Sequence, residues 1–581
     1  MRNNQFPSVT TNKKEIKILL LTVLFSALLM SRFAWLTDFP AGFHIDEAGA
    51  GYDALSLARY GVDRYLKSWP LYLTNYGSGQ SSLYAFLCAG LFRLFGYSKF
   101  LLRLPAALGS VLVWAAGVRL SDRLFGKDSF YTVFTAFLIV ICPYFVMSSR
   151  FAYDCNLMLG LSVVFLDALT DALQSEKQVC LKYFAAGVAG GILLYSYALS
   201  YIILPLFLLL SLIYLLRIRA FSLKGWICMA VPLFLLALPL LLIQVINLTD
   251  LPEMKIGIFT LTKLDRYRGA EIGRPTVEKI LRMKDALLVG DDLTFDSLPG
   301  FPNLLKPSLI LLPLGFFRGL VRLMENLKRG GGRPDKASRR PGNLDNTGMQ
   351  EISKKPSPEL LRPLITLWFL AVVSFEYCIN ALTYTLNPAF FAAAFLITEA
   401  VEGLPLIAGP VMQKYFPKAW EDEGRRSKIR KRVLLGTLGC ISCLYLAYGI
   451  RFAAFYFGTF RESGELQEYF VSDMSPAFRF IERAGVPAET VYCSDPPIGY
   501  LLTTEVSPYE IEDPSDFAYH TTASFRNITF ASVGGVDNTA CYVFKPGLFP
   551  ELCDELLASG FVRQSFPECD LYYYPSLTGG N

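Results

Sequence analysis

The chain has 581 residues, of which 53% are hydrophobic and only 18% are charged, and its formal net charge is +5. Its mean hydropathy of +0.37 is too high for a water-soluble globular protein of this length. The net charge is unremarkable, and the basic runs lie between apolar stretches, so a nucleic-acid partner is not expected. Recurring apolar runs of about 18 residues or more predict a polytopic α-helical membrane protein.

The first apolar run covers 16–36 and follows the basic pair Lys13–Lys14. It is longer than the apolar part of a signal peptide, and no small-residue cleavage site follows it, so we expect a retained membrane-spanning helix. The shorter apolar stretch 81–96 contains Arg93 and predicts an interfacial or re-entrant helix. Ten further spans are expected, which makes eleven in all: 104–121, 129–147, 157–173, 183–200, 201–217, 226–247, 304–321, 363–379, 390–411 and 433–455.

Positive charge is concentrated in three connections between these runs, at 217–225, in the loop 322–362 and at 418–432. The positive-inside rule places all three in the cytoplasm. The N-terminus is then cytoplasmic and the C-terminus extracytoplasmic. The long connections 37–103 and 248–303 become external loops, and the membrane module is expected to extend over 1–455.

The tail 456–581 differs in composition from the rest of the chain. It is polar, and alternating segments such as ETVYCSDPP and TACYVFKPG lie between helical segments such as FPELCDELLASG. This pattern predicts a small extracytoplasmic α/β or α+β domain. Four cysteines lie here, and they either pair or remain as buried thiols: Cys493, Cys541, Cys553 and Cys569. The twelve cysteines of the chain show no spacing typical of a metal site.

The candidate chemistry lies on the predicted external side. The segment GFHIDEAGAGYD places Asp46 and Glu47 just after the first span, with His44 before them. Asp154 and Arg150 follow in the turn after 129–147. The loop 248–303 adds a charged cluster, which consists of Lys263, Asp265, Arg266 and Arg268. For each of these groups the alternative interpretation is a solvated loop charge.

Such a set of charges suits transfer from an anionic lipid. A carboxylate near a hydroxyl can serve as its general base, and nearby cations can hold a phosphate leaving group. His44 could orient Asp46 or contact a phosphate when protonated, or it could simply pack as a loop histidine. The residues by themselves therefore indicate a membrane transferase or hydrolase that acts on an anionic lipid.

Two longer segments carry a resemblance to a known superfamily. They are YLTNYGSGQSSLYAFLCAGLFRLFGYSKFLLRLPAALGS, after the His-x-Asp-Glu motif, and SSRFAYDCNLML around Asp154. Together they resemble the GT-C glycosyltransferases, in particular family 39, the protein O-mannosyltransferase-like enzymes, and the related lipid A aminoarabinose transferases. The resemblance covers roughly residues 16–220, and it implies a GT-C membrane fold with a small external C-terminal domain.

The resemblance also implies roles for individual residues. Asp46 would deprotonate the acceptor hydroxyl, Glu47 would position the acceptor or the base, and Asp154 would be a second active-site acid. The relatives carry a lysine that contacts the donor phosphate where this chain has Gln80. The phosphate contact would then come from other residues: Arg103, Arg150, Lys263, Arg266 or Arg268.

The activity implied is inverting transfer of a mannose-like hexose or another sugar. The donor would be a polyprenyl-phosphate sugar, and the acceptor a hydroxyl of a protein, a polymer or a glycolipid on the extracytoplasmic face. No cofactor is implied, and a divalent metal is not expected. Two other classes stay open, a glycolipid transporter or flippase and a non-catalytic scaffold with the same fold. The absence of an internal repeat and the long external loops favour an enzyme.

Overall fold

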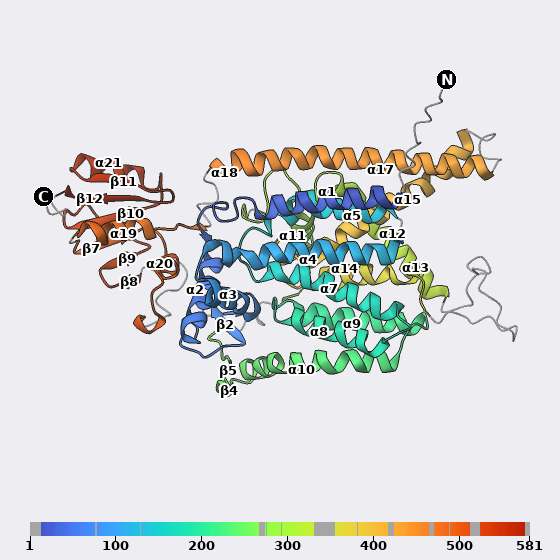
Figure 1. Cartoon of the computed structure of the whole chain (residues 1–581), viewed down its shortest axis with the longest axis horizontal. Helices are drawn as coiled ribbons and strands as arrows, with labels where there is room; N and C mark the ends of the chain where they lie inside the picture. The colour runs from blue at the N-terminus through green and yellow to red at the C-terminus, as the bar shows by residue number, and fades with distance from the viewer. Residues whose placement is uncertain are drawn as a thin grey trace, which may run out of the picture.

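The molecule is elongated and has two parts, a bundle of long helices and a smaller sheet-containing region at one end of it (Figure 1). The computed structural model describes residues 13–75, 78–127, 129–266, 273–274, 276–291, 293–329, 355–379, 381–415, 423–463, 470–486, 488–511 and 523–575. Helices run roughly parallel to the long axis of the molecule, as expected for a bundle that crosses a bilayer. The chain is thus a helical membrane protein with a mixed α/β region in its C-terminal part.

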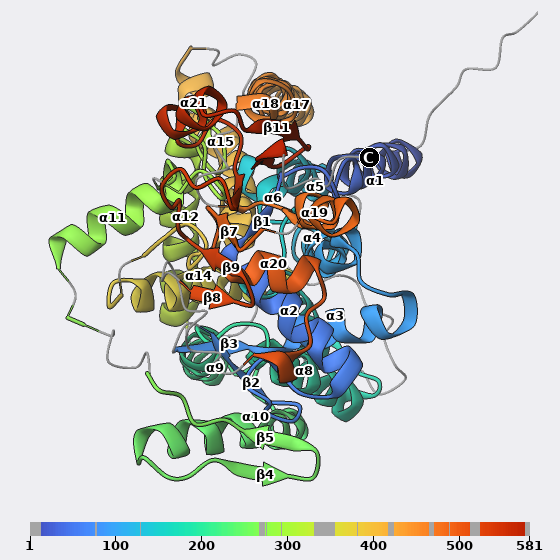
Figure 2. The same cartoon turned by 90° about the vertical axis from the view of Figure 1, so that its left-hand side faces the viewer.

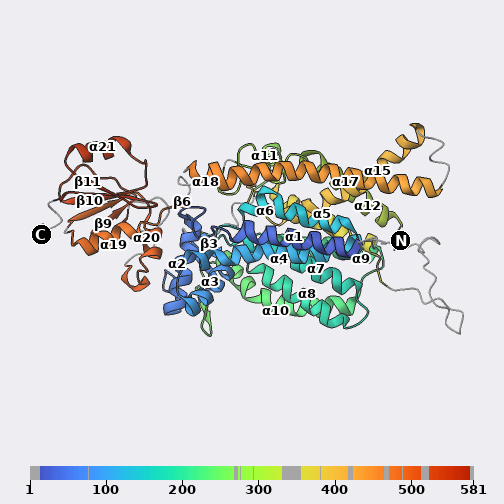
Figure 3. The same ribbon diagram turned by 45° about the horizontal axis from the view of Figure 1, so that its top comes forward.

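Each of the eleven expected spans coincides with a helix in the described part of the chain. They are α1 (Lys13–Phe33), α4 (Lys99–Phe125), α5 (Phe130–Ile141), α7 (Cys155–Gln174), α8 (Val179–Leu194), α9 (Ser200–Arg217), α10 (Leu223–Leu248), α12 (Ser308–Arg329), α14 (Pro363–Glu376), α15 (Ala389–Tyr415) and α17 (Glu423–Ala454). Short helices precede or continue some of them: α6 (Pro143–Met147), α13 (Pro358–Leu361), a π-helical turn (Phe455–Thr459) and α18 (Phe460–Ser463). Helix α17 lies along the outside of the bundle (Figure 3).

Seven helices in the described ranges are long and apolar enough to cross a membrane. Helices α5 and α8 are apolar but shorter, and α5 ends where Pro143 prevents the backbone hydrogen bond that would continue it. Helix α12 continues to Arg329, although the sequence predicts that its span ends at residue 321. Of the two α12 arginines that pair with carboxylates of α15, Arg322 lies in these additional turns and Arg318 lies just before them.

Those carboxylates, Glu399 and Glu402, form an ion-pair cluster that joins three helices. Arg322 pairs with Glu399, and Arg318 lies 3.0 Å from Glu402. Arg362 approaches Glu402 to 2.6 Å. A buried carboxylate at membrane depth needs such partners, because desolvation without them is costly. This cluster explains why two glutamates can lie within an apolar run.

The end of the bundle beside the sheet region carries the shorter elements of the first long connection. They are β1 (Phe43–His44), α2 (Ile45–Tyr60), β2 (Tyr72–Asn75), β3 (Ser78–Ser81) and α3 (Ser82–Phe95). Helix α3 occupies the stretch for which the sequence predicts a non-crossing helix. Its fourteen residues are too few to span about 30 Å of hydrocarbon at 1.5 Å per residue. The elements β4 (Met254–Ile256), β5 (Phe259–Leu261) and α11 (Val277–Leu288) lie toward the sides of the same end (Figure 2).

The C-terminal region is built on one mixed sheet. Its strands are β7 (Thr490–Cys493), β8 (Ala523–Phe525), β9 (Ile528–Phe530), β10 (Ala540–Phe544), β11 (Val562–Ser565) and β12 (Asp570–Tyr573). They lie in the order β11-β12-β10-β7-β9-β8, with β7 parallel to both of its neighbours. The helices are α19 (Ser475–Ala484), α20 (Pro497–Thr503) and α21 (Pro550–Ala558). Strand β10 is buried along its whole length, as expected for a strand covered on both faces. All twelve cysteines are free thiols, so the four in this region do not pair in the structure.

The sheet region is tied directly to the connection that follows the first span. The short strand β6 (Phe470–Val471) pairs antiparallel with β1, so that Phe470 lies opposite His44. The carboxylate of Glu568 accepts a hydrogen bond from Gly42 N at 3.0 Å and lies 3.3 Å from Lys99 Nζ. These contacts fix the residues just before Asp46 from the side of the C-terminal region.

Candidate active site

The Asp-Glu pair lies at the N-terminus of α2, where a capping box determines its geometry. His44 is the N-cap, and its Nδ1 accepts a hydrogen bond from Asp46 N at 3.3 Å. In return, Glu47 Oε2 accepts from His44 N at 3.1 Å. Acidic groups at this position also interact favourably with the helix dipole. Successive residues of a helix point about 100° apart, so the two carboxylates have different surroundings.

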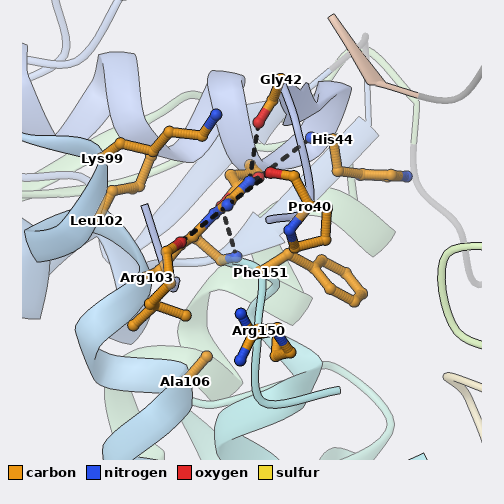
Figure 4. A network of polar contacts seen from close by, with 12 residues as sticks. Pro40, Gly42, His44, Lys99, Leu102, Arg103, Ala106, Arg150 and Phe151 are labelled. Atoms are coloured by element: carbon orange, nitrogen blue, oxygen red, sulfur yellow. Dashed lines mark hydrogen bonds and ion pairs between the residues drawn. The ribbon is translucent and has the colours of Figure 1, made fainter. Parts of the chain in front are cut away.

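Glu47 is fully buried and forms an ion pair with Arg103 of α4. Figure 4 shows Arg103 close to Pro40, Gly42 and Arg150. Arg103 Nε donates to Oε1 at 2.8 Å and Nη2 donates to Oε2 at 3.1 Å. Oε1 also accepts from Ala152 N at 2.9 Å. Each oxygen of Glu47 therefore accepts two hydrogen bonds, and the side chain joins α2, α4 and the turn before Asp154. This geometry makes Glu47 a positioning residue for the helix that carries Asp46.

Arg103 uses all five of its N–H donors inside the protein. Besides Glu47, the guanidinium donates to the backbone carbonyls of Leu36, Pro40 and Gly42 at 2.8–3.0 Å. The resemblance suggested Arg103 as a contact for donor phosphate, but no donor is left for such a contact. Arg103 instead fixes the connection between α1 and α2.

Arg150 has a similar role. It is buried and donates to the carbonyls of Ser31 and Ala34, each at 2.8 Å, and of Phe39 at 2.9 Å. Its guanidinium also lies over the ring of Phe457, 5.1 Å from the centroid. Arg150 therefore clamps the end of α1 through both terminal nitrogens, while its Nε has no partner, and its expected contact with the donor phosphate stays a prediction.

Asp46 is the more accessible member of the pair. About 20% of its side chain is exposed, and its Oδ1 accepts a hydrogen bond from Asn75 Nδ2 at 2.9 Å. Its Oδ2 lies 3.8 Å from His44 Nδ1, too far for a hydrogen bond. The uncharged amide of Asn75 thus holds the carboxylate of Asp46, and part of this carboxylate remains accessible to solvent. A general base requires such an arrangement.

Asp154 is brought to the same site by the β2–β3 ribbon. Its Oδ2 accepts from Ser81 N of β3 at 3.1 Å, and its Oδ1 accepts from Cys155 N at 2.9 Å, where it caps α7. In the ribbon Ser81 lies opposite Tyr72, three residues before Asn75. The anchor points of the two carboxylates are therefore roughly 10 Å apart along the ribbon. Asp154 is 3% exposed, and these contacts hold it against the ribbon; its expected role as a second active-site acid stays a prediction.

His44 lies among aromatic rings rather than in open solvent. Its ring centroid is 4.6 Å from that of Phe295 and 5.4 Å from that of Tyr153. Burial lowers the pKa of the imidazole, and the neighbouring carboxylates offset this only in part. His44 is therefore neutral near pH 7, which argues against the expected contact with phosphate through a protonated ring and favours the orienting role.

The remaining predicted residues have different environments. Lys263 lies beyond β5 and pairs with Asp250 at 2.7 Å, with both side chains largely exposed. Arg266 is described at the end of the same segment, and Arg268 lies outside the described residues. Gln80 of β3 is only 5% exposed, yet neither atom of its amide has a hydrogen-bond partner.

Two interactions near Asp46 are not evident from sequence. Arg64 forms a buried, bidentate ion pair with Asp53 of α2, with contacts of 2.8 and 2.9 Å. Its guanidinium lies against Gly49, one helical turn after Asp46. Asn75 holds Asp46 itself. The only sequence signal for Arg64 and Asn75 is their position in the polar stretch that follows the Asp-Glu pair.

Among the described residues, no group of three or more His, Cys, Asp or Glu side chains could hold a metal ion.

No family model matches the chain, and no curated protein does either. Solved structures are similar to it at low identity. ArnT from Cupriavidus metallidurans, bound to undecaprenyl phosphate, is 14% identical with a TM-score of 0.49, over 97% of this chain and 99% of that one. AglB, an archaeal oligosaccharyltransferase from Archaeoglobus fulgidus, is 13% identical with a TM-score of 0.45, over 96% of this chain and 74% of that one. The arabinofuranosyltransferase AftD from Mycobacteria is 11% identical with a TM-score of 0.44, over 97% of this chain and 40% of that one.

Proposed function

We propose that the chain is an inverting GT-C glycosyltransferase that moves a sugar from a polyprenyl-phosphate donor to a hydroxyl acceptor. The reaction takes place at the extracytoplasmic face, on the end of the bundle that carries α2, α3 and the C-terminal region. The observation that carries the proposal is the environment of Asp46. It is a partly exposed carboxylate, held by Asn75 at the N-terminus of a helix that buried ion pairs keep in place.

In the proposed reaction Asp46 accepts the proton of the acceptor hydroxyl as the hydroxyl oxygen attacks the anomeric carbon. The new carbon–oxygen bond forms on the face opposite the phosphate, and the bond from the anomeric carbon to the phosphate oxygen breaks. The lipid phosphate leaves with that electron pair, so the configuration at the anomeric carbon is inverted. A general base of this kind contributes roughly 10²–10⁴-fold to the rate.

The structure supports a separation of tasks among the predicted residues. Glu47, Arg103, Arg150 and Asp154 make contacts within the protein, and these contacts position the helix and the ribbon around Asp46. Lys263, which pairs with the exposed Asp250, and Arg266 remain candidates for the cation that holds the donor phosphate. The bilayer would deliver the lipid donor laterally, while the acceptor would enter from the aqueous side.

The test compares wild-type protein with Asp46→Asn. Asparagine keeps an oxygen that can accept from Asn75 and has nearly the same shape, so the variant should fold with an unchanged Tm. We expect release of lipid phosphate from labelled polyprenyl-phosphate sugars to fall by roughly 10²–10⁴-fold. Asp554→Asn, on the exposed face of α21, is the matched control and should retain full activity.

Two results would contradict the proposal. One is equal turnover by wild-type protein and Asp46→Asn, which would exclude Asp46 as the base. The other is that wild-type protein binds the lipid and moves it across a reconstituted bilayer without consuming it, which would favour a transporter.

A further inference from the structure

The β2–β3 ribbon presents two buried amide side chains whose hydrogen-bonding groups are not satisfied within the protein. Gln80 is 5% exposed, and neither its Nε2 nor its Oε1 has a partner. Asn75 is 4% exposed, and its Oδ1 has no partner, although its Nδ2 donates to Asp46. Buried polar groups are normally hydrogen-bonded, because each unpaired group loses its interaction with water without compensation. Two such groups on one short ribbon therefore need an explanation.

The register of the ribbon places both amides on one face. Leu73 lies opposite Gln80, and Asn75 is two residues further along β2, so these side chains point to the same side. This is the side on which Asn75 meets Asp46. Thr74 points to the opposite side. The two unsatisfied amides thus lie on the side of the proposed base, whereas the hydroxyl of Thr74, which also has no partner, lies on the other side.

The chemistry of these groups indicates what they would bind. An amide offers both N–H donors and a carbonyl acceptor, and it carries no charge. A sugar hydroxyl likewise donates one hydrogen bond and accepts others, so an amide can pair with it in either sense. A phosphate has acceptors only, and it would leave the two amide oxygens without a donor. The groups therefore fit ring hydroxyls better than the lipid phosphate.

We propose that Asn75 and Gln80 form the subsite for the hydroxyl groups of a sugar ring, the one transferred from the donor. This inference rests on the proposed function for the identity of the ligand, but it assigns Gln80 to the sugar rather than to the phosphate. Asn75 would contact the sugar and the base together, and would thus couple the position of the ring to that of Asp46. Gln80 would contact the sugar alone.

Gln80 gives the sharper test because its amide makes no hydrogen bond within the protein. Gln80→Met keeps the length of the side chain and removes the amide, so no internal contact is lost and Tm should not fall. Thr74→Val, on the opposite face of the same ribbon, is the matched control. Asn75 is unsuitable, since its replacement would also release Asp46.

The measurement is the affinity of detergent-solubilised full-length protein for bare polyprenyl phosphate and for a panel of polyprenyl-phosphate hexoses and pentoses. The ratio of the two dissociation constants gives the contribution of the sugar. For wild-type protein and Thr74→Val we expect at least one glycosylated lipid to bind about tenfold or more tightly than the bare lipid. For Gln80→Met we expect this ratio to approach one, with unchanged affinity for the bare lipid.

The outcomes separate this inference from the proposed function. If wild-type protein turns over a donor but Gln80→Met keeps the same ratio, the subsite assignment is wrong and the transferase proposal stands. If the ratio depends on Gln80 but no donor is turned over with any acceptor, the subsite stands and the transferase proposal fails. A ratio of one in wild-type protein across the whole panel overturns the subsite, and the amides would then be satisfied by water.

Discussion

Replacing Glu47 by glutamine is the perturbation that best distinguishes the two members of the Asp-Glu pair. Each oxygen of Glu47 accepts one N–H from Arg103 and one backbone N–H, from Ala152 or His44, at 2.8–3.1 Å. The amide of glutamine has the same shape, but its NH₂ group cannot accept a hydrogen bond. In either orientation it therefore faces two donors that lose their acceptor.

The cost follows from burial. Both Glu47 and Arg103 have side chains with no exposed surface, so the guanidinium keeps its charge without a counter-ion. Breaking such a buried pair by removing one partner costs about 3–5 kcal/mol. The matched control is Glu505→Gln, which removes the partner of Arg59 at a site where both side chains are more than one-third exposed. An exposed pair of this kind contributes about 0–1 kcal/mol.

The assay is thermal unfolding in detergent, followed by tryptophan fluorescence, together with turnover of the lipid donor. We expect a clearly lower Tm for Glu47→Gln and little change for Glu505→Gln. If Glu47→Gln kept the Tm of wild-type protein but lost turnover, the positioning role would be refuted and Glu47 would have to act on substrate.

Three further predictions follow from contacts around the site. Gly49→Ala would place a Cβ 2.7 Å from Nη2 of Arg64, so we expect denaturant titrations to show a loss of about 1–3 kcal/mol of stability. The control is Gly90→Ala in α3, where a Cβ meets nothing within 4 Å, and it should be neutral or stabilising. Burial and the nearby Asp53 raise the pKa of Asp63 to about 7. The folded state then binds a proton that the unfolded state has lost above about pH 4, so the stability of wild-type protein falls as the pH rises toward 7. The Tm advantage of Asp63→Asn over wild type should therefore grow between about pH 5 and 8. Arg150→Lys offers three donors where the guanidinium makes four contacts to carbonyls, so amide exchange over residues 34–39 should accelerate, and unchanged exchange would contradict the clamp.

Much of the membrane fold could be predicted from the sequence because it depends on local properties of the chain. Apolar runs of sufficient length form helices wherever backbone groups must be satisfied without water, and each expected span coincides with a helix. The differences lie at boundaries. Pro143 ends α5 before the expected limit, and α12 extends beyond residue 321, where Arg322 pairs with Glu399 on another helix.

The position of the candidate site in the chain could be predicted from the sequence, but the separate roles of its residues could not. Asp46 and Glu47 are chemically similar neighbours, and only the arrangement of α4 and the turn before Asp154 makes one a buried ion-pair partner and leaves the other accessible. The arginines show the same limit, since the sequence gives their charge but not whether backbone carbonyls already occupy their donors.

The sequence by itself determined the class of the protein, the expected spans and the stretch in which the acidic pair lies, because composition and periodicity are properties of contiguous residues. The tertiary structure alone decided that β6 of the C-terminal region pairs with the strand before Asp46, that Arg64 lies against Gly49, and that Asn75 and Gln80 face the same side. These contacts join residues far apart in the chain or depend on strand register. These contacts depend on which buried groups pair with one another when the whole chain packs, and they cannot be predicted from any single segment.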